Sequence, residues 1–248
     1  MVSFSTLISK LTQKIYSRNS KWYVKYLRKK GVEVGDNTQF FGEKAIDITR
    51  PCLVEIGNNC VFTDGVKVLT HGYDWSVLRE KFGEVLCSSG KVVIEDNVFI
   101  GTNSIILKGV RIGRDSVIGA GSVVTRDIPA GSVAAGNPCK AIMTIDEYYQ
   151  KRKIEYINEA KAYAFELYKK TKKIPKPEDF WEEFPLFLNR TGPWGKLPVK
   201  QQVGSALDNF LSSKPIYGSF EDFLMDAGIP VDKSGAFPTF PRNNSRKK

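Results

Sequence analysis

The chain has 248 residues, 42% of them hydrophobic, which is enough to bury a core in one or two domains. No apolar run is long enough to cross a membrane, and Lys10 and Lys14 interrupt the first apolar stretch too early for a signal peptide. The four cysteines show neither metal-ligand spacing nor the density of a disulfide scaffold. We therefore expect a cytoplasmic protein with reduced thiols.

The net charge of +10 is concentrated at the N-terminus, where residues 1–30 contain eight Lys or Arg and no acid. The rest of the chain holds 29 basic and 27 acidic residues, a nearly neutral body that is poorly suited to bind nucleic acid. Apolar residues from Phe4 to Tyr26 recur with helical spacing, so residues 1–33 are predicted to form a basic amphipathic helical segment. We favour a segment that covers the open end of the next domain over one that makes a weak contact with a membrane surface.

Residues 34–143 repeat with a period of six. The first column of the repeat is Ile94, Ile100, Ile106, Ile112, Ile118 and Val124, and small or aliphatic residues follow four positions after each. This period fits short strands joined by tight turns around a triangular solenoid, of which about four to six turns would fit here. Gly101, Gly113 and Gly119 are expected at corners that need unusual backbone angles.

The repeat is interrupted twice. The step from Ile46 to Ile56 is ten residues instead of twelve, and the step from Val68 to Ile94 is 26 instead of 24. The second interruption predicts a long loop over residues 71–91, extruded from a solenoid corner. Because loops on rigid scaffolds concentrate function, it matters that this loop begins with His71, the only histidine of the chain.

Residues 144–248 have a different composition and are predicted to form a helical, aromatic-rich extension with a disordered tail. Thr144 and Glu147 have the spacing of a capping box, which predicts a helix that runs to about Lys173. Shorter helices are expected over residues 178–184, 201–212 and 220–226.

The segments VKVLTHGYDWSVLREKFGE, IGAGSVVT and AAGNPCK resemble the hexapeptide-repeat acyltransferases, in the branch of maltose, galactoside and surface-polysaccharide O-acetyltransferases. The resemblance implies a mainly β fold, a left-handed parallel β-helix, assembled as a homotrimer with active sites between subunits. It implies an acetyl-CoA-dependent O-acetyltransferase of polysaccharide biosynthesis whose acceptor is a small molecule or glycan.

His71 matches the family's catalytic histidine. An acceptor hydroxyl must lose its proton as it attacks the thioester, and a neutral imidazole is suited to take that proton. A carboxylate would orient the ring, and Asp74 is the first choice among Asp74, Asp64, Glu80 and Glu84, although each could be a solvated loop charge.

Seven residues match the family's coenzyme A contacts: Gly101, Thr102, Gly119, Ala120, Thr125, Arg126 and Lys140. Arg126 and Lys140 would face the phosphates, whereas the two glycines would either leave room for the pantetheine arm or serve a steric need of the fold.

Tyr73, Trp75 and Arg79 could stack on and hydrogen-bond a sugar acceptor, or pack the loop against a neighbouring subunit. Three other functions stay open: N-acetylation of an amino sugar, a noncatalytic scaffold, and a ping-pong reaction through Cys87. No metal is expected, because zinc sites on this scaffold need three histidines and the chain has one.

Overall fold

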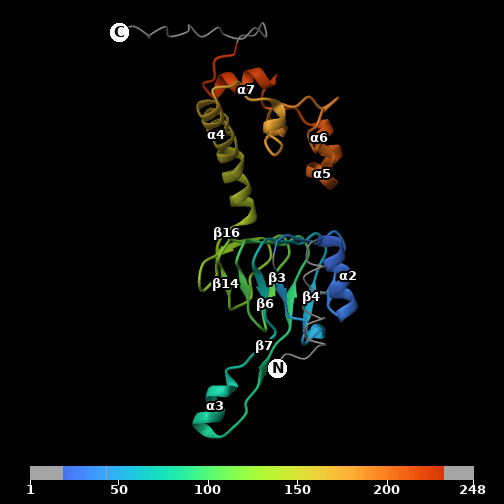
Figure 1. Cartoon of the computed structure of the whole chain (residues 1–248), viewed down its shortest axis with the longest axis vertical. Helices are drawn as coiled ribbons and strands as arrows, with labels where there is room; N and C mark the ends of the chain where they lie inside the picture. The colour runs from blue at the N-terminus through green and yellow to red at the C-terminus, as the bar shows by residue number, and fades with distance from the viewer. Residues whose placement is uncertain (1–18, 43, 232–248) are drawn as a thin grey trace, which may run out of the picture. The chain divides into compact units, whose positions relative to one another are not determined.

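The computed structural model describes residues 19–42 and 44–231, which divide into two compact units with the boundary after Gln150. Figure 1 shows the elements of both units, and each unit is treated by itself here. The expected helical stripe before residue 19 and the expected tail after residue 231 lie outside the described residues.

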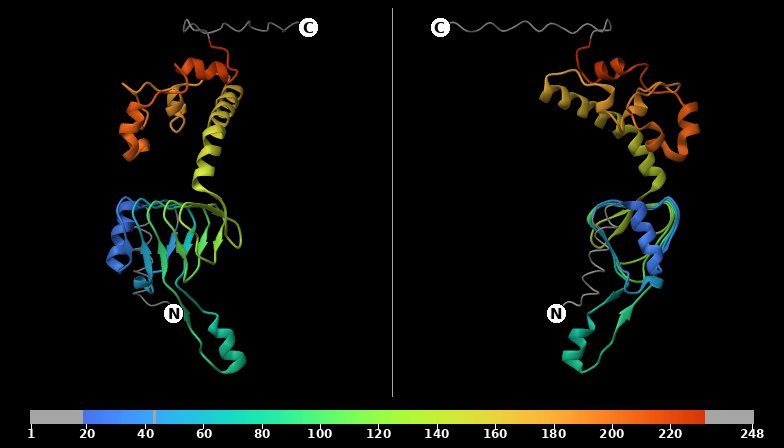
Figure 2. Two further views of the ribbon diagram at one scale, coloured as in Figure 1. Left: turned by 180° about the vertical axis from the view of Figure 1, so that it is seen from behind. Right: turned by 45° about the vertical axis from the view of Figure 1, so that its right-hand side comes forward.

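The first unit contains three sheets of short stacked strands, which we call A, B and C, and a separate two-stranded sheet (Figures 1 and 2). Sheet A contains β1 (Glu33–Val34), β4 (Val54–Ile56), β9 (Val92–Ile94) and β12 (Arg111–Ile112). Sheet B contains β2 (Gln39–Phe40), β5 (Val61–Phe62), β10 (Phe99–Ile100), β13 (Val117–Ile118), β15 (Ser132–Ala135) and β16 (Lys140–Thr144). Sheet C contains β3 (Lys44–Ile46), β6 (Val66–Val68), β11 (Ile105–Ile106) and β14 (Val123–Val124).

The chain visits sheets A, B and C in turn, so each coil of three strands stacks on the previous one in parallel register. Ile100 pairs with Ile118 in sheet B, and Ile106 pairs with Val124 in sheet C. Three hexads therefore make one coil, as the period predicted. The repeating aliphatic residues point inward and form one continuous buried core. Only β16 runs antiparallel to its neighbour among the strands of sheets A to C.

Both interruptions of the repeat lie at the same corner, between a strand of sheet C and the next strand of sheet A. We call this the C-to-A corner; it comprises residues 47–53, 69–91, 107–110 and 125–127. Ile46 and Ile56 are separated by one hexad step lengthened by four residues, which include the 3₁₀ turn Pro51–Leu53. Val68 and Ile94 are likewise separated by one step, lengthened by twenty residues. The expected counts of twelve and 24 were wrong, because each interruption is an insertion at one corner.

The second insertion folds as an arm, residues 71–91. Its two sides pair as the antiparallel strands β7 (His71–Gly72) and β8 (Ser88–Ser89), and α3 (Trp75–Phe82) lies between them. Figure 2 shows the arm projecting from the stacked coils. The predicted loop is thus an ordered hairpin whose first residue is His71.

The expected reason for the corner glycines was wrong. Gly101, Gly113 and Gly119 do not have positive φ angles; the left-handed corner positions are held instead by residues such as Asn103, at φ 59°, and Gly121, at φ 69°. A Cβ on Gly113 would lie 2.4 Å from the backbone nitrogen of Ala130 in the next coil. These glycines are therefore required by the close stacking of coils.

The helix α2 (Ser20–Lys30) covers the first coil. It begins at Asn19, whose side chain accepts hydrogen bonds from the next turn, and ends at Gly31 in a left-handed conformation. Its buried residues Tyr23, Tyr26 and Leu27 belong to the same core as the first strands. α2 thus covers the first coil, and the cap role expected for the whole segment of residues 1–33 stays a prediction.

The second unit contains most of α4 (Ile145–Thr171), α5 (Val199–Val203), α6 (Leu207–Ser212), α7 (Phe220–Asp226) and three 3₁₀ turns (Pro177–Asp179, Phe184–Leu186 and Gly204–Ala206). The capping box between Thr144 and Glu147 is present, with both backbone nitrogens bonded to the opposite side chain. The short helix expected over 178–184 is replaced by two 3₁₀ turns. None of the helices in the described part of the chain is long and apolar enough to cross a bilayer.

The two uses of glycine predict different tolerance to asparagine. Gly121→Asn should change the free energy of unfolding little, because nothing lies within 4 Å of an added Cβ and asparagine already adopts the left-handed conformation at Asn103. Gly113→Asn should destabilise the protein by about 1–3 kcal/mol or more, because its Cβ meets backbone. Thermal and urea unfolding of both variants would measure this, and equal effects would contradict the assignment of the two roles.

Candidate active site

The side chains of His71 and Asp47 meet at the C-to-A corner. Asp47 follows β3, and His71 follows β6 one coil later, so the stacking of β3 on β6 brings the two positions together. The distance from His71 Nδ1 to Asp47 Oδ2 is 2.8 Å. The Asp47 side chain is 7% exposed and that of His71 is 14% exposed. The ring is thus fixed on one side by a buried carboxylate while part of it stays open to solvent.

Two threonines hold the carboxylate of Asp47. Thr49 donates to Oδ1 from its backbone nitrogen at 2.9 Å and its hydroxyl at 2.6 Å. Thr70 donates to Oδ2 from its nitrogen at 3.2 Å and its hydroxyl at 2.5 Å. Burial raises the pKa of Asp47, but the hydrogen bonds from Thr49 and Thr70 outweigh burial and hold this pKa well below the ordinary value. Asp47 is therefore ionised throughout the neutral range.

This arrangement sets the tautomer of the imidazole. An ionised carboxylate only accepts hydrogen bonds, so the Nδ1 of His71 must carry a proton and donate it to Asp47. In the neutral ring Nε2 then has the free lone pair. His71 is consequently arranged to accept a proton at Nε2, with Asp47 opposite the positive charge that would result.

Asp74, the first choice as orienting carboxylate, is placed differently. Its Oδ1 accepts a hydrogen bond from Ser88 Oγ at 3.2 Å, and the same hydroxyl accepts one from Lys108 Nζ at 2.8 Å. Asp74 thus ties together the two sides of the arm, while Asp47 holds His71. The sequence did contain a signal: aligning Ile46 with Val68 as neighbours in one column places Asp47 beside residues 69–71.

The three predicted acceptor residues extend from His71 along the arm. The rings of His71 and Tyr73 meet edge to face at 5.3 Å, and Tyr73 and Trp75 follow at 6.3 Å. The Arg79 guanidinium lies 5.5 Å from the Trp75 ring and also pairs with Glu80. Since Tyr73 is 69% exposed, this aromatic row offers a stacking surface next to the imidazole.

The predicted coenzyme A residues lie on two different corners of the chain. Thr125 and Arg126 are exposed on the C-to-A corner that also carries His71. Gly101, Thr102, Gly119 and Ala120 lie on the corner between sheets B and C, and Lys140 begins β16. The structure explains both glycines by coil stacking, because a Cβ on Gly101 would lie 2.5 Å from Ala120 N and one on Gly119 would lie 2.9 Å from Ala135 Cβ.

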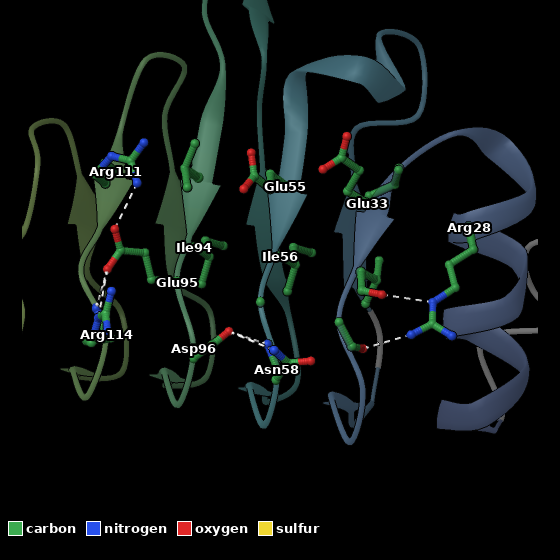
Figure 3. A pocket seen from close by; sticks show the side chains of 15 residues that line it. Arg28, Glu33, Glu55, Ile56, Asn58, Ile94, Glu95, Asp96, Arg111 and Arg114 are labelled. Atoms are coloured by element: carbon green, nitrogen blue, oxygen red, sulfur yellow. Dashed lines mark hydrogen bonds and ion pairs between the residues drawn. The ribbon is translucent and has the colours of Figure 1, made fainter.

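A groove of about 680 Å³ lies on the outer face of sheet A (Figure 3). Several of its polar side chains are bonded to one another: Glu95 bonds to Arg111 and Arg114, and Asp96 accepts from Asn58. We therefore assign no chemistry to this groove. Within residues 19–42 and 44–231, no three His, Cys, Asp or Glu side chains are grouped to hold a metal ion.

Comparison with known proteins agrees with the repeat. Residues 91–126 match the family profile described as hexapeptide repeat of succinyl-transferase. The chain is 38% identical over 155 residues to Protein CapG of Staphylococcus aureus, in an alignment that covers 59% of this chain and 89% of CapG. It belongs to the hexapeptide-repeat acyltransferases.

Two further relatives are more partial. A putative acetyltransferase of Saccharomyces cerevisiae, YJL218W, is 44% identical over 116 residues, which cover 47% of this chain and 57% of the yeast protein. The crystal structure of a maltose O-acetyltransferase from Clostridium difficile 630 is 27% identical, with a TM-score of 0.39, and covers 54% of this chain and 83% of that one. As a member of this family, the chain is an acyltransferase enzyme.

The tautomer can be observed directly because the chain has one histidine. In protein labelled with ¹⁵N-histidine, NMR of the neutral ring should show a protonated Nδ1 and an unprotonated Nε2 for His71. Asp47→Ala should abolish this preference, because it removes the acceptor at 2.8 Å, whereas Asp74→Ala should preserve it. A wild-type ring protonated on Nε2 alone would contradict the assignment.

Proposed function

We propose that this hexapeptide-repeat acyltransferase transfers the acetyl group of acetyl-CoA to a hydroxyl group of a sugar or surface-polysaccharide precursor, with His71 as general base. The observation that carries this proposal is the partly open imidazole of His71, which is hydrogen-bonded through Nδ1 to a buried carboxylate. Such a pair is suited to a reaction in which a weak nucleophile must lose a proton as it attacks.

His71 Nε2 would accept the proton of the acceptor hydroxyl while the oxygen bonds to the acetyl carbonyl carbon. Asp47 would stabilise the imidazolium and keep the ring in place without itself taking the proton. When the carbon–sulfur bond breaks, the imidazolium would return the proton to the departing thiolate. The products are the acetyl ester and the free thiol of coenzyme A, so protons and charges balance without a metal. This makes Asp47 a positioning residue and replaces Asp74 in that role.

We further propose the left-handed coil and the homotrimer that are typical of this family. Thr102 lies on the corner between sheets B and C, and Thr125 lies on the C-to-A corner, so the width of sheet C separates them within one chain. A coenzyme A molecule that contacts both residue positions would therefore meet Thr102 of one subunit and Thr125 of another. This favours a binding site shared between copies. Arg126 and Lys140 would supply positive charge for the donor's phosphates. The enzyme would work in the cytoplasm.

For the acceptor, the proposal assigns Tyr73 and Trp75 to stacking against a sugar ring and Arg79 to hydrogen bonding at its edge. Acetylation of an amino sugar nitrogen is the closest alternative. Release of coenzyme A measured with paired acceptors, one with a free hydroxyl and one with a free amine at the same carbon, separates the two reactions.

Replacing the base should stop catalysis without affecting donor binding. His71→Ala and His71→Gln should each lower kcat by about 10²–10⁴, because neither residue can accept the proton. Protonation of Asp47 should not alter kcat/KM in the neutral range, because the hydrogen bonds from Thr49 and Thr70 hold its pKa well below the ordinary value. Asp47→Asn should lower kcat by about 10–10⁴, with Asp74→Asn near wild type as the matched control. A His71→Ala enzyme with more than about a tenth of wild-type turnover would exclude His71 as the base and make Cys87 the next candidate.

The cofactor assignment can be tested with coenzyme A and dephospho-coenzyme A. If Arg126 and Lys140 face the 3′-phosphate, replacing both with Ala should weaken binding of coenzyme A by about tenfold or more and affect the dephospho form less. Isothermal titration measures both affinities. Unchanged affinities would remove the two side chains from the donor site.

A further inference from the structure

The outer side of α2 carries a row of cations that its capping role does not explain. Lys21, Lys25 and Lys29 recur at positions i, i+4 and i+8, so their side chains lie one above another on one helix face. All three are exposed, and Trp22, 53% exposed, lies beside the row around the helix. We call these four residues the basic face of α2.

This arrangement works against the stability of the helix. Like charges four residues apart repel, and the first turn of α2, where acids are favourable, has none. Arg28 of α2 forms an ion pair with Asp36 at 2.9 Å. Among the described residues, no carboxylate forms an ion pair with any of the three lysines. A cap needs only the buried residues Tyr23, Tyr26 and Leu27. Lys29, in the last turn, is placed favourably for the helix dipole, whereas neither capping nor helix stability accounts for Lys21 and Lys25.

We propose that the basic face of α2 binds the surface of an anionic lipid membrane. Lysines near such a surface are attracted to its acidic headgroups, and tryptophan is the side chain enriched at the boundary between headgroups and hydrocarbon. The opposite side of α2 is buried in the core. The helix therefore holds the lysine row and Trp22 together on its solvent-exposed side. The preceding chain adds further positive charge, since residues 1–30 hold eight basic residues and no acid.

The surroundings favour a membrane over a nucleic acid. A phosphate backbone needs a positive surface that continues over many residues. Next to α2, the outer face of sheet A alternates in charge. Glu55 pairs with Lys91 at 2.6 Å. Glu95 pairs with Arg111 at 2.8 Å, as Figure 3 shows. A continuous positive surface therefore does not extend from α2 onto sheet A, which disfavours a phosphate backbone along this side of the helix.

The test measures cosedimentation of the full-length protein with phosphatidylcholine vesicles, prepared with and without phosphatidylserine. The wild type should bind the anionic vesicles, bind neutral ones far less, and be released by high salt. A variant with Lys21, Lys25 and Lys29 changed to Gln should bind anionic vesicles roughly 10²-fold more weakly. The matched control variant carries the same change to Gln at Lys170, Lys173 and Lys200, which are exposed lysines of the second unit. It should bind anionic vesicles like the wild type.

Three outcomes would overturn the proposal: unchanged binding by the α2 variant, equal loss in the control, or tighter binding of wild type to duplex DNA than to anionic vesicles. Thermal unfolding of both variants checks that they are folded. The substitutions should not unfold the protein, because none of the six side chains is buried, and relief of the repulsion along α2 acts to raise its stability. Vesicle binding is measured without acetyl transfer. The membrane proposal would therefore still stand if the proposed reaction were disproved.

Discussion

The close parallel stacking of eighteen-residue coils is the constraint on which the rest of the first unit depends. Each inward aliphatic residue lies directly above its equivalent in the coil below, as Ile100 does with Phe62 and Ile118. The corners must then pass one another at a spacing that leaves no room for a Cβ at several positions, Gly101 and Gly113 among them. Regular coils fix the height of every residue, so any irregularity has to leave the stack at a corner.

The candidate active site is a product of that rule. Two insertions of unequal length project from the same corner in successive coils. The first residues of the short insertion lie next to the first residues of the long one, because β3 pairs with β6 directly before them. The short insertion contributes the buried Asp47 and its partner Thr49, and the long one contributes Thr70 and His71. The scaffold thereby supplies precise placement, while the irregular segments supply the chemistry. If α2 also contacts a membrane, it would do so from the capped end of the same rigid stack.

The sequence predicted the coils well because period six is a physical consequence of one inward side chain per face. It located His71 at the base of an ordered insertion and the capping box at Thr144 for similarly local reasons. It did not locate Asp47, since the contact joins residues 24 positions apart whose proximity depends on counting an insertion as one lengthened step. It also wrongly explained the corner glycines by unusual backbone angles. A close approach between coils and a positive φ angle both select glycine, so the sequence alone does not distinguish the two causes.

The two ends of the coil stack are closed by different elements. A parallel solenoid has an exposed row of backbone donors and acceptors at each end, where another chain could add strands and extend the stack. The buried side of α2 covers the first coil, and at the far end β16 pairs with β15 in the antiparallel direction. A strand of reversed direction cannot continue the parallel register, so it ends sheet B. Sheet B therefore cannot be extended beyond β16 in the parallel register of the coils, whether by the same chain or by another copy.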